Sequence, residues 1–354
     1  VFQFEEVCHD LIMENLEICN AAGSGNEGDS FAHGAAAARF LGSNITVRNC
    51  HSHHNENGFF ASHPADYIVI DSCRIDHNGA VTEEKHAPTH NFYFCGKHQI
   101  VINSYIHNSM EGENFKSRGE NTIFAFNWVE EDAAYSIEVA SGGALKTLWL
   151  GNVLIKRSDI GIGQGRLLCY GDGTGVAQGG LYVLNNTFIS KRPGDYYLFT
   201  FPTSKDDVVL VNNVFAGPAE VFATHNGTGK VRGSNNWISN AAGELPADLK
   251  NTVRGDDPGF ADAAALDFRP KAGAPLANAG VTSEEYDEIL NTALEFATSG
   301  TEAAPSPAYL AVLERVKGAA PAFTPVRALS APAARETSVG IDIGAFEAVA
   351  AGTP

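Results

Sequence analysis

Residues 183–188, 210–215 and 233–238 read VLNNTF, LVNNVF and GSNNWI, and this short phrase decides the fold. An apolar stretch precedes a small polar residue, and another apolar position follows it. Weaker copies run back towards the start of the chain. The aligned polar position is occupied by Cys19, Cys50, Cys73, Ser104, Asn127, Asn152, Asn186, Asn213 and Asn236. Nine units at intervals of 23 to 34 residues are typical of a repeat protein, and their strand-like composition predicts a β-solenoid.

The recurring asparagine gives this prediction a physical reason. Coils of three short strands would place equivalent residues about 4.8 Å apart, which is the spacing between neighbouring strands. Side-chain amides stacked at that spacing can hydrogen-bond to one another as a ladder. A β-sandwich is the alternative, but a sandwich does not need an asparagine at one fixed offset. We therefore predict an all-β fold with a parallel solenoid over residues 1–240, and we expect N-terminal coils to be missing because Val1 opens inside strand-like sequence.

The repeat stops near residue 240, and residues 241–354 are expected to form a C-terminal segment of another kind. Residues 283–298 place apolar side chains at helical spacing, with Ser283 as the expected N-cap. Residues 308–317 predict a second short helix. Since solenoids need their ends covered, we expect this segment to dock on the solenoid and cover its open end.

Composition excludes several classes of partner. The chain of 354 residues carries 24 Lys and Arg against 42 Asp and Glu, a formal charge of −18. Nucleic acid is excluded as the main partner, because phosphate binding needs a basic face. No apolar run approaches the roughly 18 residues of a transmembrane helix, so no membrane span is expected. We expect a monomer that is secreted, periplasmic or held at the cell surface, although the chain shows no signal peptide.

Three of the six cysteines fall at the repeated polar position, namely Cys19, Cys50 and Cys73. A small polarisable side chain packs well there, which favours free buried thiols. A disulfide framework is the alternative. Stacked residues lie within disulfide reach, but their parallel Cβ directions disfavour closure.

A second strand recurs in each coil, and it predicts an outward row of side chains. It reads HNFYFCG (90–96), ENFKSRG (113–119) and YSIEVAS (135–141). If Phe92, Phe115 and Ile137 face inward, alternation turns the next residue of each strand to solvent. The outward residues are then Tyr93, Lys116 and Glu138, with Arg118 beside Lys116 and with Asn91 and Asn114 one step earlier.

This outward row suits proton abstraction next to a carboxylate. Lys116 or Tyr93 would remove the proton and the other would protonate the leaving oxygen. Arg118 would neutralise the substrate carboxylate and stabilise the charge that develops on it. Asn91, Asn114 and Tyr135 are the expected substrate contacts nearby. The alternative is a solvated charge row in which Glu138 merely pairs with Lys116, a contact worth little at a surface.

Histidines gather at the corner that follows the repeated polar position. Three residues past that position come His53, Asp76, His107 and Glu130, and four past it come His54, His77, Asn108 and Glu131. Stacked His and Asp side chains suit a transition metal or a general base, and equally a polar corner that satisfies backbone groups. We expect His53, His77 and His107 to contact substrate, and we add His90, at the end of the insert 79–91, to the catalytic candidates.

Carboxylates are dense in the same part of the chain. They are Glu111, Glu113, Glu130, Glu131, Asp132 and Glu138. A pair of them could run glycoside hydrolysis, in which the separation of the two carboxylates decides the stereochemistry. They could also hold Ca²⁺, which takes six to eight oxygen ligands.

These residues carry a family resemblance. The coils over roughly residues 1–240 resemble right-handed parallel β-helix proteins of the pectate-lyase-like superfamily, and DIGAFE (342–347) resembles their C-terminal ending. The stretch EGENFKSRGENTIFAFNWV (111–129) is similar to chondroitinase-B/alginate-lyase type polysaccharide lyases. That resemblance implies Glu111 and Glu113 as Ca²⁺ ligands and Lys116 as the base. It also implies an Arg on the next coil, whereas this chain has Glu138 there and Arg118 on the Lys116 strand.

Three functions follow from these patterns. The first is a carbohydrate-active enzyme, a polysaccharide lyase that cleaves a uronic-acid-containing glycan by β-elimination. A C5-epimerase would share its first steps. The second is a glycoside hydrolase on the same scaffold, using Glu138 with Glu113 or Asp132. The third is a non-catalytic glycan-binding or structural β-helix, in which Tyr93 and Tyr135 would stack on sugars. In each case the expected partner is a polysaccharide or oligosaccharide, with Ca²⁺ as the only cofactor and no organic one.

Overall fold

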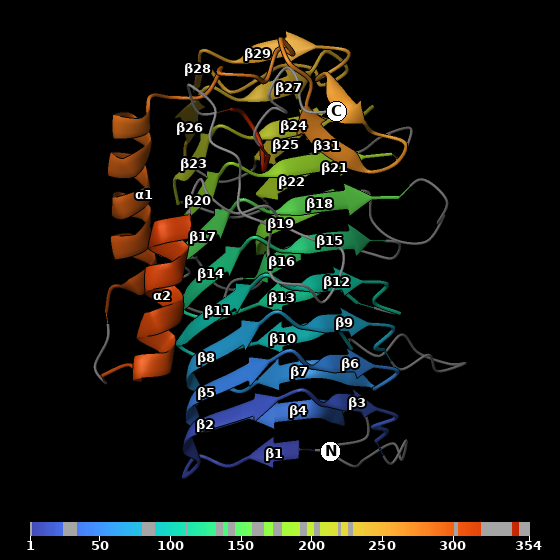
Figure 1. Ribbon diagram of the computed structural model, residues 1–354, viewed down its shortest axis with the longest axis vertical. Coiled ribbons are helices and arrows are strands. Elements are labelled where there is room, and N and C mark those ends of the chain that lie inside the picture. Colours follow the sequence, from blue (N-terminus) through green and yellow to red (C-terminus); the bar gives the residue numbers. More distant parts are fainter. Residues whose placement is uncertain are drawn as a thin grey trace.

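The computed structural model shows a parallel β-helix built from three long sheets (Figure 1). The structure describes residues 2–23, 34–79, 89–110, 112–131, 137–140, 146–157, 166–172, 179–191, 197–201, 206–218, 221–225, 229–300, 304–319 and 342–346. All pairings within the three long sheets are parallel, and each strand pairs with the equivalent strand of the next coil. The predicted all-β solenoid is therefore confirmed.

Each coil contributes one strand to each sheet, here named sheets A, B and C. Sheet A consists of β1 (Phe2–Phe4), β4 (Ala36–Phe40), β7 (Asn57–Ala61), β10 (Phe92–Phe94), β13 (Phe115–Ser117), β16 (Ile137–Ala140), β19 (Arg166–Asp172), β22 (Tyr197–Phe201) and β25 (Val221–His225). Sheet B consists of β2 (His9–Glu14), β5 (Ser43–Arg48), β8 (Asp66–Asp71), β11 (His98–Ile102), β14 (Asn121–Ala125), β17 (Lys146–Leu150), β20 (Gly180–Leu184), β23 (Val208–Val211), β26 (Val231–Ser234) and β28 (Asp248–Lys250). Sheet C consists of β3 (Glu17–Cys19), β6 (His51–His53), β9 (Arg74–Asp76), β12 (Tyr105–His107), β15 (Trp128–Glu131), β18 (Val153–Lys156), β21 (Thr187–Ser190), β24 (Val214–Ala216), β27 (Trp237–Ser239) and β29 (Val253–Gly255).

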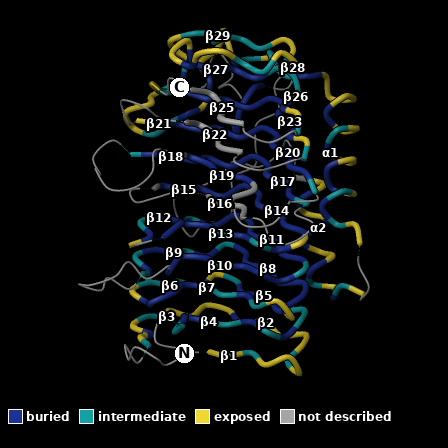
Figure 2. The backbone as a smooth tube through the Cα atoms, turned by 180° about the vertical axis from the view of Figure 1, so that it is seen from behind, coloured by how far each residue is buried: buried dark blue, intermediate teal, exposed yellow. Residues whose placement is uncertain are grey.

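The core inside the coils is a stack of like residues. Phe59, Phe92 and Phe115 lie one above another on sheet A, and Phe40 lies diagonally beside Phe59; all four are fully buried, with neighbouring ring centroids 5.7 to 6.2 Å apart. Strand alternation sends these rings inward and their neighbours outward. Figure 2 shows the resulting buried interior, with exposed positions in the first coil, on the helices and around β28 and β29 at the opposite end.

The predicted amide ladder is present where sheet B turns into sheet C. The side-chain Nδ2 of each Asn donates to Oδ1 of the next, at 3.1 Å from Asn127 to Asn152 and 2.8 Å from Asn152 to Asn186. Each Oδ1 also accepts a backbone N–H from the coil before it. The ladder continues through Asn213 and Asn236, and Ser104 accepts from the backbone N–H of Cys73 in the same way. Buried polar groups of the corner backbone are thereby satisfied.

The first rung of the predicted alignment is wrong. Cys19 pairs in register with His53, so the residue equivalent to Cys50 is Leu16. The phrase LEICNA contains a Cys that imitates the repeat at the wrong offset. Cys50 and Cys73 do occupy the ladder position, and all six cysteines are free. The alternative prediction of a disulfide framework is therefore wrong.

A second amide ladder, which the sequence did not reveal, lies where sheet C turns into sheet A. Asn55 donates to Asn78 at 3.0 Å, Asn78 to Asn91 at 2.8 Å, and Asn91 to Asn114 at 2.6 Å. All four side chains are buried. Stacked amides thus hold the corner between sheets C and A in these earlier coils and the corner between sheets B and C in the later coils.

The C-terminal segment covers the sides of the solenoid. Helices α1 (Ser283–Thr298) and α2 (Pro307–Ala319) lie along the outer face of sheet B, which is apolar there (Figure 1). We expected this segment to cover the open end of the solenoid. The two helices instead cover the outer face of sheet B, because the apolar side chains that need cover lie on that face. The N-cap is Thr282, whose side chain accepts from the Glu285 backbone N–H, so Ser283 is the first helical residue. Among the described residues, no helix is long and apolar enough to cross a membrane.

Within the described residues, the outer face of sheet C is covered along its later strands. The coils continue past residue 240 to β29, and an antiparallel hairpin follows, formed by β30 (Phe260–Asp262) and β31 (Asp267–Pro270). Phe268 of this hairpin stacks on Trp128 with ring centroids 5.8 Å apart. From Trp128 towards the C-terminus the outer face is apolar and packed. In the earlier coils the same face carries histidines and carboxylates instead.

Replacing Asn152 by Ala is expected to lower the free energy of unfolding by about 2 kcal/mol or more, because it leaves buried partners in the adjacent coils without hydrogen bonds. Asn152→Ser, which imitates the natural Ser104 rung, should cost less. Urea denaturation measures both. Asn291→Ala, on an exposed helix position, is the matched control. Equal stability of Asn152→Ala and this control would contradict the structural role of the ladder.

Candidate functional site

The outward row predicted on sheet A is present in the expected register. Tyr93 pairs with Lys116, and Lys116 pairs with Glu138, on three consecutive strands. Tyr93 also pairs with Phe60, and Phe60 pairs with Arg39. Because each strand contributes every second residue to this face, the five positions form one column on the outside of the solenoid.

Tyr93 is surrounded by cationic and aromatic groups. The guanidinium carbon of Arg118 lies 5.9 Å from the centroid of the Tyr93 ring, within the range of a cation–π contact. The His90 ring stacks on Tyr93 with centroids 5.4 Å apart. Lys116 places its Nζ 3.7 Å from Oε2 of Glu113, and its side chain is only 14% exposed. The four predicted residues His90, Tyr93, Lys116 and Arg118 therefore meet in one place.

His90 and Glu113 form a buried pair beneath this cluster. Nδ1 of His90 lies 2.7 Å from Oε2 of Glu113 and 3.0 Å from the Glu113 backbone nitrogen. Gly112 allows this approach, since a Cβ at that position would collide with the imidazole and with the Thr89 carbonyl. Burial lowers the pKa of His90, and the neighbouring carboxylate opposes that effect only in part. A neutral imidazole thus supports the Tyr93 ring at neutral pH.

Other predicted site residues do not belong to this surface. Asn91 and Asn114 are fully buried rungs of the second ladder, so their amides hold the fold together. The alternation of side chains along a strand does not apply to these two residues. Each lies in the corner just before its strand, and there the side chain turns inward. Glu111 and Tyr135 lie outside the described residues. For Glu138 the structure describes the backbone position, and its pairing with Lys116 is as expected.

Two residues of this face were missed from the sequence, Arg39 and Phe60. The Arg39 guanidinium lies 4.6 Å from the centre of the Phe60 ring, and Phe60 lies 5.0 Å from the Tyr93 ring. Phe60 lies in the phrase GFFAS (58–62), where alternation from an inward Phe59 would have turned it outward. Arg39 needed the pairing of an additional strand, β4, that the repeat did not indicate.

The histidine-rich corner forms a second cluster, on the outer face of sheet C. His53 pairs with Asp76, and Asp76 pairs with His107, as the spacing predicted. The Asp76 carboxylate is the centre of this cluster. It lies 2.7 Å from His51 Nε2, 2.6 Å from His77 Nδ1 and 2.8 Å from Arg74 Nε.

Burial and mutual contacts set the charge states in this second cluster. Burial acts to raise the pKa of Asp76, but hydrogen bonds from His77 and His51 and the nearby His107 and Arg74 lower it well below its usual range. Burial lowers the pKa of His107 to about 4 and also lowers that of His51. The carboxylate is therefore ionised and these imidazoles are neutral at pH 7.

Potential metal ligands gather on sheet C and not around Glu113. Within the described residues two groups of three such side chains occur, Glu17 with His51 and His53, and Asp76 with His77 and His107. At Glu113, by contrast, the carboxylate lies against the Lys116 ammonium and the His90 ring. A neighbouring ammonium competes with a bound cation, and this contact disfavours the Ca²⁺ ligand role implied for Glu113.

Comparison with known proteins adds no assignment. No protein-family model matches the sequence, and no curated protein matches it.

The protein should lose stability as the pH falls through about 6.5, the ordinary histidine pKa. The folded-state pKa of His90 lies below that value, so the unfolded chain binds more protons in this range and acid favours unfolding. His90→Gln should show a shallower loss of unfolding free energy between pH 7 and 5 in urea titrations. His63→Gln, at an exposed turn, should follow the wild type. An unchanged slope in His90→Gln would show that His90 does not carry this effect.

Proposed function

We propose that the protein is a polysaccharide lyase that cleaves a uronic-acid-containing glycan by β-elimination on the outer face of sheet A. The observation that carries the proposal is the pairing of Tyr93 with Lys116 on adjacent strands, with Arg118 over the Tyr93 ring. This arrangement places a base, an acid and a cation that can pair with the substrate carboxylate within one small area. Such groups gain precision from a rigid strand scaffold.

Local charge supports an acidic substrate despite the net charge of −18. Arg39, Lys116 and Arg118 all lie on the outer side of sheet A or at its margin. Phe60 and Tyr93 lie between them in the same column. A row of cations and aromatic rings suits a chain of sugars that carry carboxylates, because the rings can stack on sugar faces while the cations pair with the acid groups.

The proposed reaction balances without a redox partner. Arg118 pairs with the uronate carboxylate and makes the neighbouring C5 proton more acidic. Tyr93 or Lys116 takes that proton, and the electron pair passes into the carboxylate as an enolate-like charge. The C4–O4 bond then breaks, the second residue of the pair gives a proton to O4, and a C4–C5 double bond remains in the product.

Glu113 and His90 act in this proposal as positioning residues. Glu113 holds the Lys116 ammonium at 3.7 Å, and His90 supports the Tyr93 ring from one side. Both side chains are almost completely buried, at 7% and 4% exposure. Glu113 is thus poorly placed to be a hydrolytic carboxylate open to water, which favours the lyase over the glycoside hydrolase.

Glycan binding without catalysis is the second candidate. It is favoured by the aromatic pair of Phe60 and Tyr93, whose rings lie 5.0 Å apart on the outer face. The two functions differ in their demand on the Tyr93 hydroxyl. A lyase needs this group as base or acid, whereas stacking needs only the ring.

The test follows the ultraviolet absorbance of the unsaturated product on polygalacturonate, alginate and chondroitin. Lys116→Met and Tyr93→Phe are each expected to lower the rate about a hundredfold or more, because each removes a proton-transfer group. Lys271→Met, at an exposed lysine of the C-terminal segment, is the matched control and should keep full activity.

Glycan binding by Tyr93→Phe, measured by calorimetry, separates the two candidates. Retained binding with lost turnover supports the lyase. Absence of unsaturated product from the wild type on every uronic-acid polymer, together with binding that survives in Tyr93→Phe, would replace the lyase by the binding function.

A further inference from the structure

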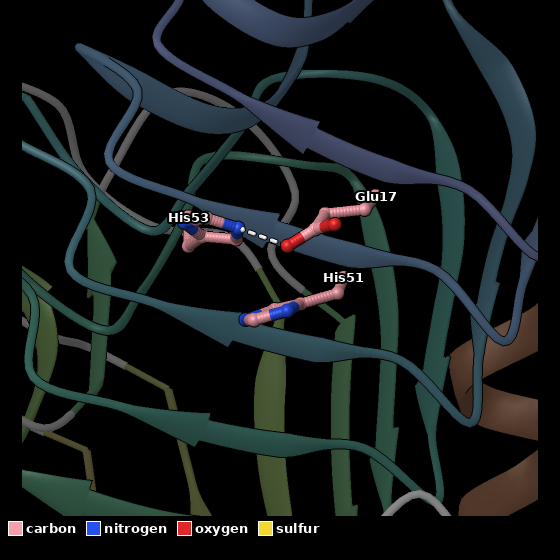
Figure 3. A group of neighbouring side chains, drawn as sticks. All are labelled: Glu17, His51 and His53. Atoms are coloured by element: carbon pink, nitrogen blue, oxygen red, sulfur yellow. Dashed lines mark hydrogen bonds and ion pairs between the residues drawn. The ribbon is translucent and has the colours of Figure 1, made fainter.

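The first coils of sheet C bring three donor side chains together on the outside of the solenoid, on a face separate from that of the proposed lyase site (Figure 3). His51 and His53 are two residues apart on β6, so both point to the same side of the strand. Glu17 on the adjacent strand β3 pairs directly with His51. One donor atom from each of the three residues lies within 4.8 Å of the other two.

The separations are close to those of a metal's ligand shell. Metal–nitrogen distances of about 2.0 Å in a tetrahedral site put two ligand atoms roughly 3.3 Å apart. Oε1 of Glu17 and Nε2 of His53 form a hydrogen bond of 2.9 Å, so they would need to move apart by only about 0.4 Å to bind one ion, and the His51 and His53 rings have centroids 4.2 Å apart. Glu17 is 69% exposed, so its carboxylate can adjust by small rotations without disturbing the core.

Each histidine is held through its other ring nitrogen. Nε2 of His51 lies 2.7 Å from Oδ1 of Asp76, and this carboxylate oxygen accepts a hydrogen bond from it. Nδ1 of His53 lies 2.8 Å from Nδ1 of His54. The nitrogens left to face an ion are then Nδ1 of His51 and Nε2 of His53, and the ion would replace the hydrogen bond between Nε2 of His53 and Glu17. Metal-binding histidines are oriented in this way by a carboxylate or another acceptor behind them.

We propose that Glu17, His51 and His53 bind a divalent transition-metal ion of the zinc class, with Asp76 and His54 as the outer partners that orient the two imidazoles. Two imidazoles and one carboxylate suit zinc and its neighbours among the first-row metals. Three protein ligands leave at least one coordination position open to water or to a bound molecule. The proposal is independent of the lyase proposal, because no residue of the sheet A cluster takes part.

The second group of donors fits a metal less well. Nδ1 of His77 lies 2.6 Å from Asp76, a hydrogen-bond distance that is too short for two ligands of one ion. Asp76 also binds the Arg74 guanidinium at 2.8 Å. The Arg74 guanidinium already balances the charge of this carboxylate. Asp76 is therefore better suited to orient His51 than to bind a cation itself.

The experiment titrates Zn²⁺ into the full chain, prepared without a polyhistidine tag, by isothermal calorimetry. Co²⁺ absorption reports the ligand geometry in parallel. We expect one Zn²⁺ per chain, with binding lost in His51→Ala, His53→Ala and Glu17→Gln. Asp76→Asn should weaken binding by roughly tenfold to a hundredfold, as loss of an outer partner does. His63→Ala and Glu120→Gln, at exposed positions elsewhere, should bind as the wild type does.

Glu17→Gln keeps the experiment decisive if a histidine variant fails to fold, because Glu17 is exposed and its replacement has nearly the same shape. Circular dichroism checks the fold of every variant. Absence of Zn²⁺ binding by the wild type would overturn the proposal. So would unchanged binding in folded Glu17→Gln and His51→Ala, or binding that is lost in His107→Ala and kept in His51→Ala, which would place the ion at the second group.

Discussion

Satisfaction of buried backbone groups at the corners of the coil is the constraint on which this structure depends. A polypeptide that turns sharply inside a packed stack leaves N–H and C=O groups without strand partners, and each unpaired group costs stability. The asparagine side chain carries both a donor and an acceptor, so it can serve the backbone of one coil and the amide of the next. Asn127 to Asn236 do this at one corner, and Asn55 to Asn114 do it at another.

The outer surfaces of the three sheets differ from one another. Because the corner hydrogen bonds and the inner core hold the coils together, the outer side chains can vary without loss of the fold. Sheet B presents apolar side chains and is covered by α1 and α2. The later part of sheet C is also apolar and is covered by the β30–β31 hairpin. Sheet A and the early part of sheet C carry charged, aromatic and imidazole side chains on their outer faces. The two proposed sites lie on these two faces.

The sequence predicts those parts of the structure that follow from periodicity. The ladder from Ser104 onward and the column of Tyr93 and Lys116 both result from a repeat of coils and an alternation of two along a strand. The predictions were wrong where the alternation along a strand is interrupted, and where a residue outside the ladder resembles one of its members. Asn91 and Asn114 sit in a corner that reverses their direction, and Cys19 imitates a rung that Leu16 occupies. Glu17 and His51 were not predicted to meet, because their contact needs the correct pairing of the first two coils.

The ladder also bears on how a solenoid of this kind can change its length. Each stacked amide contacts only the coils directly above and below it, so the stabilisation is a sum of nearest-neighbour terms. An inserted or deleted coil that keeps one asparagine at the rung would restore every hydrogen bond at the new junction. The outer face of sheet A can therefore be lengthened or shortened by whole coils during evolution, while the local geometry around Tyr93 and Lys116 is preserved.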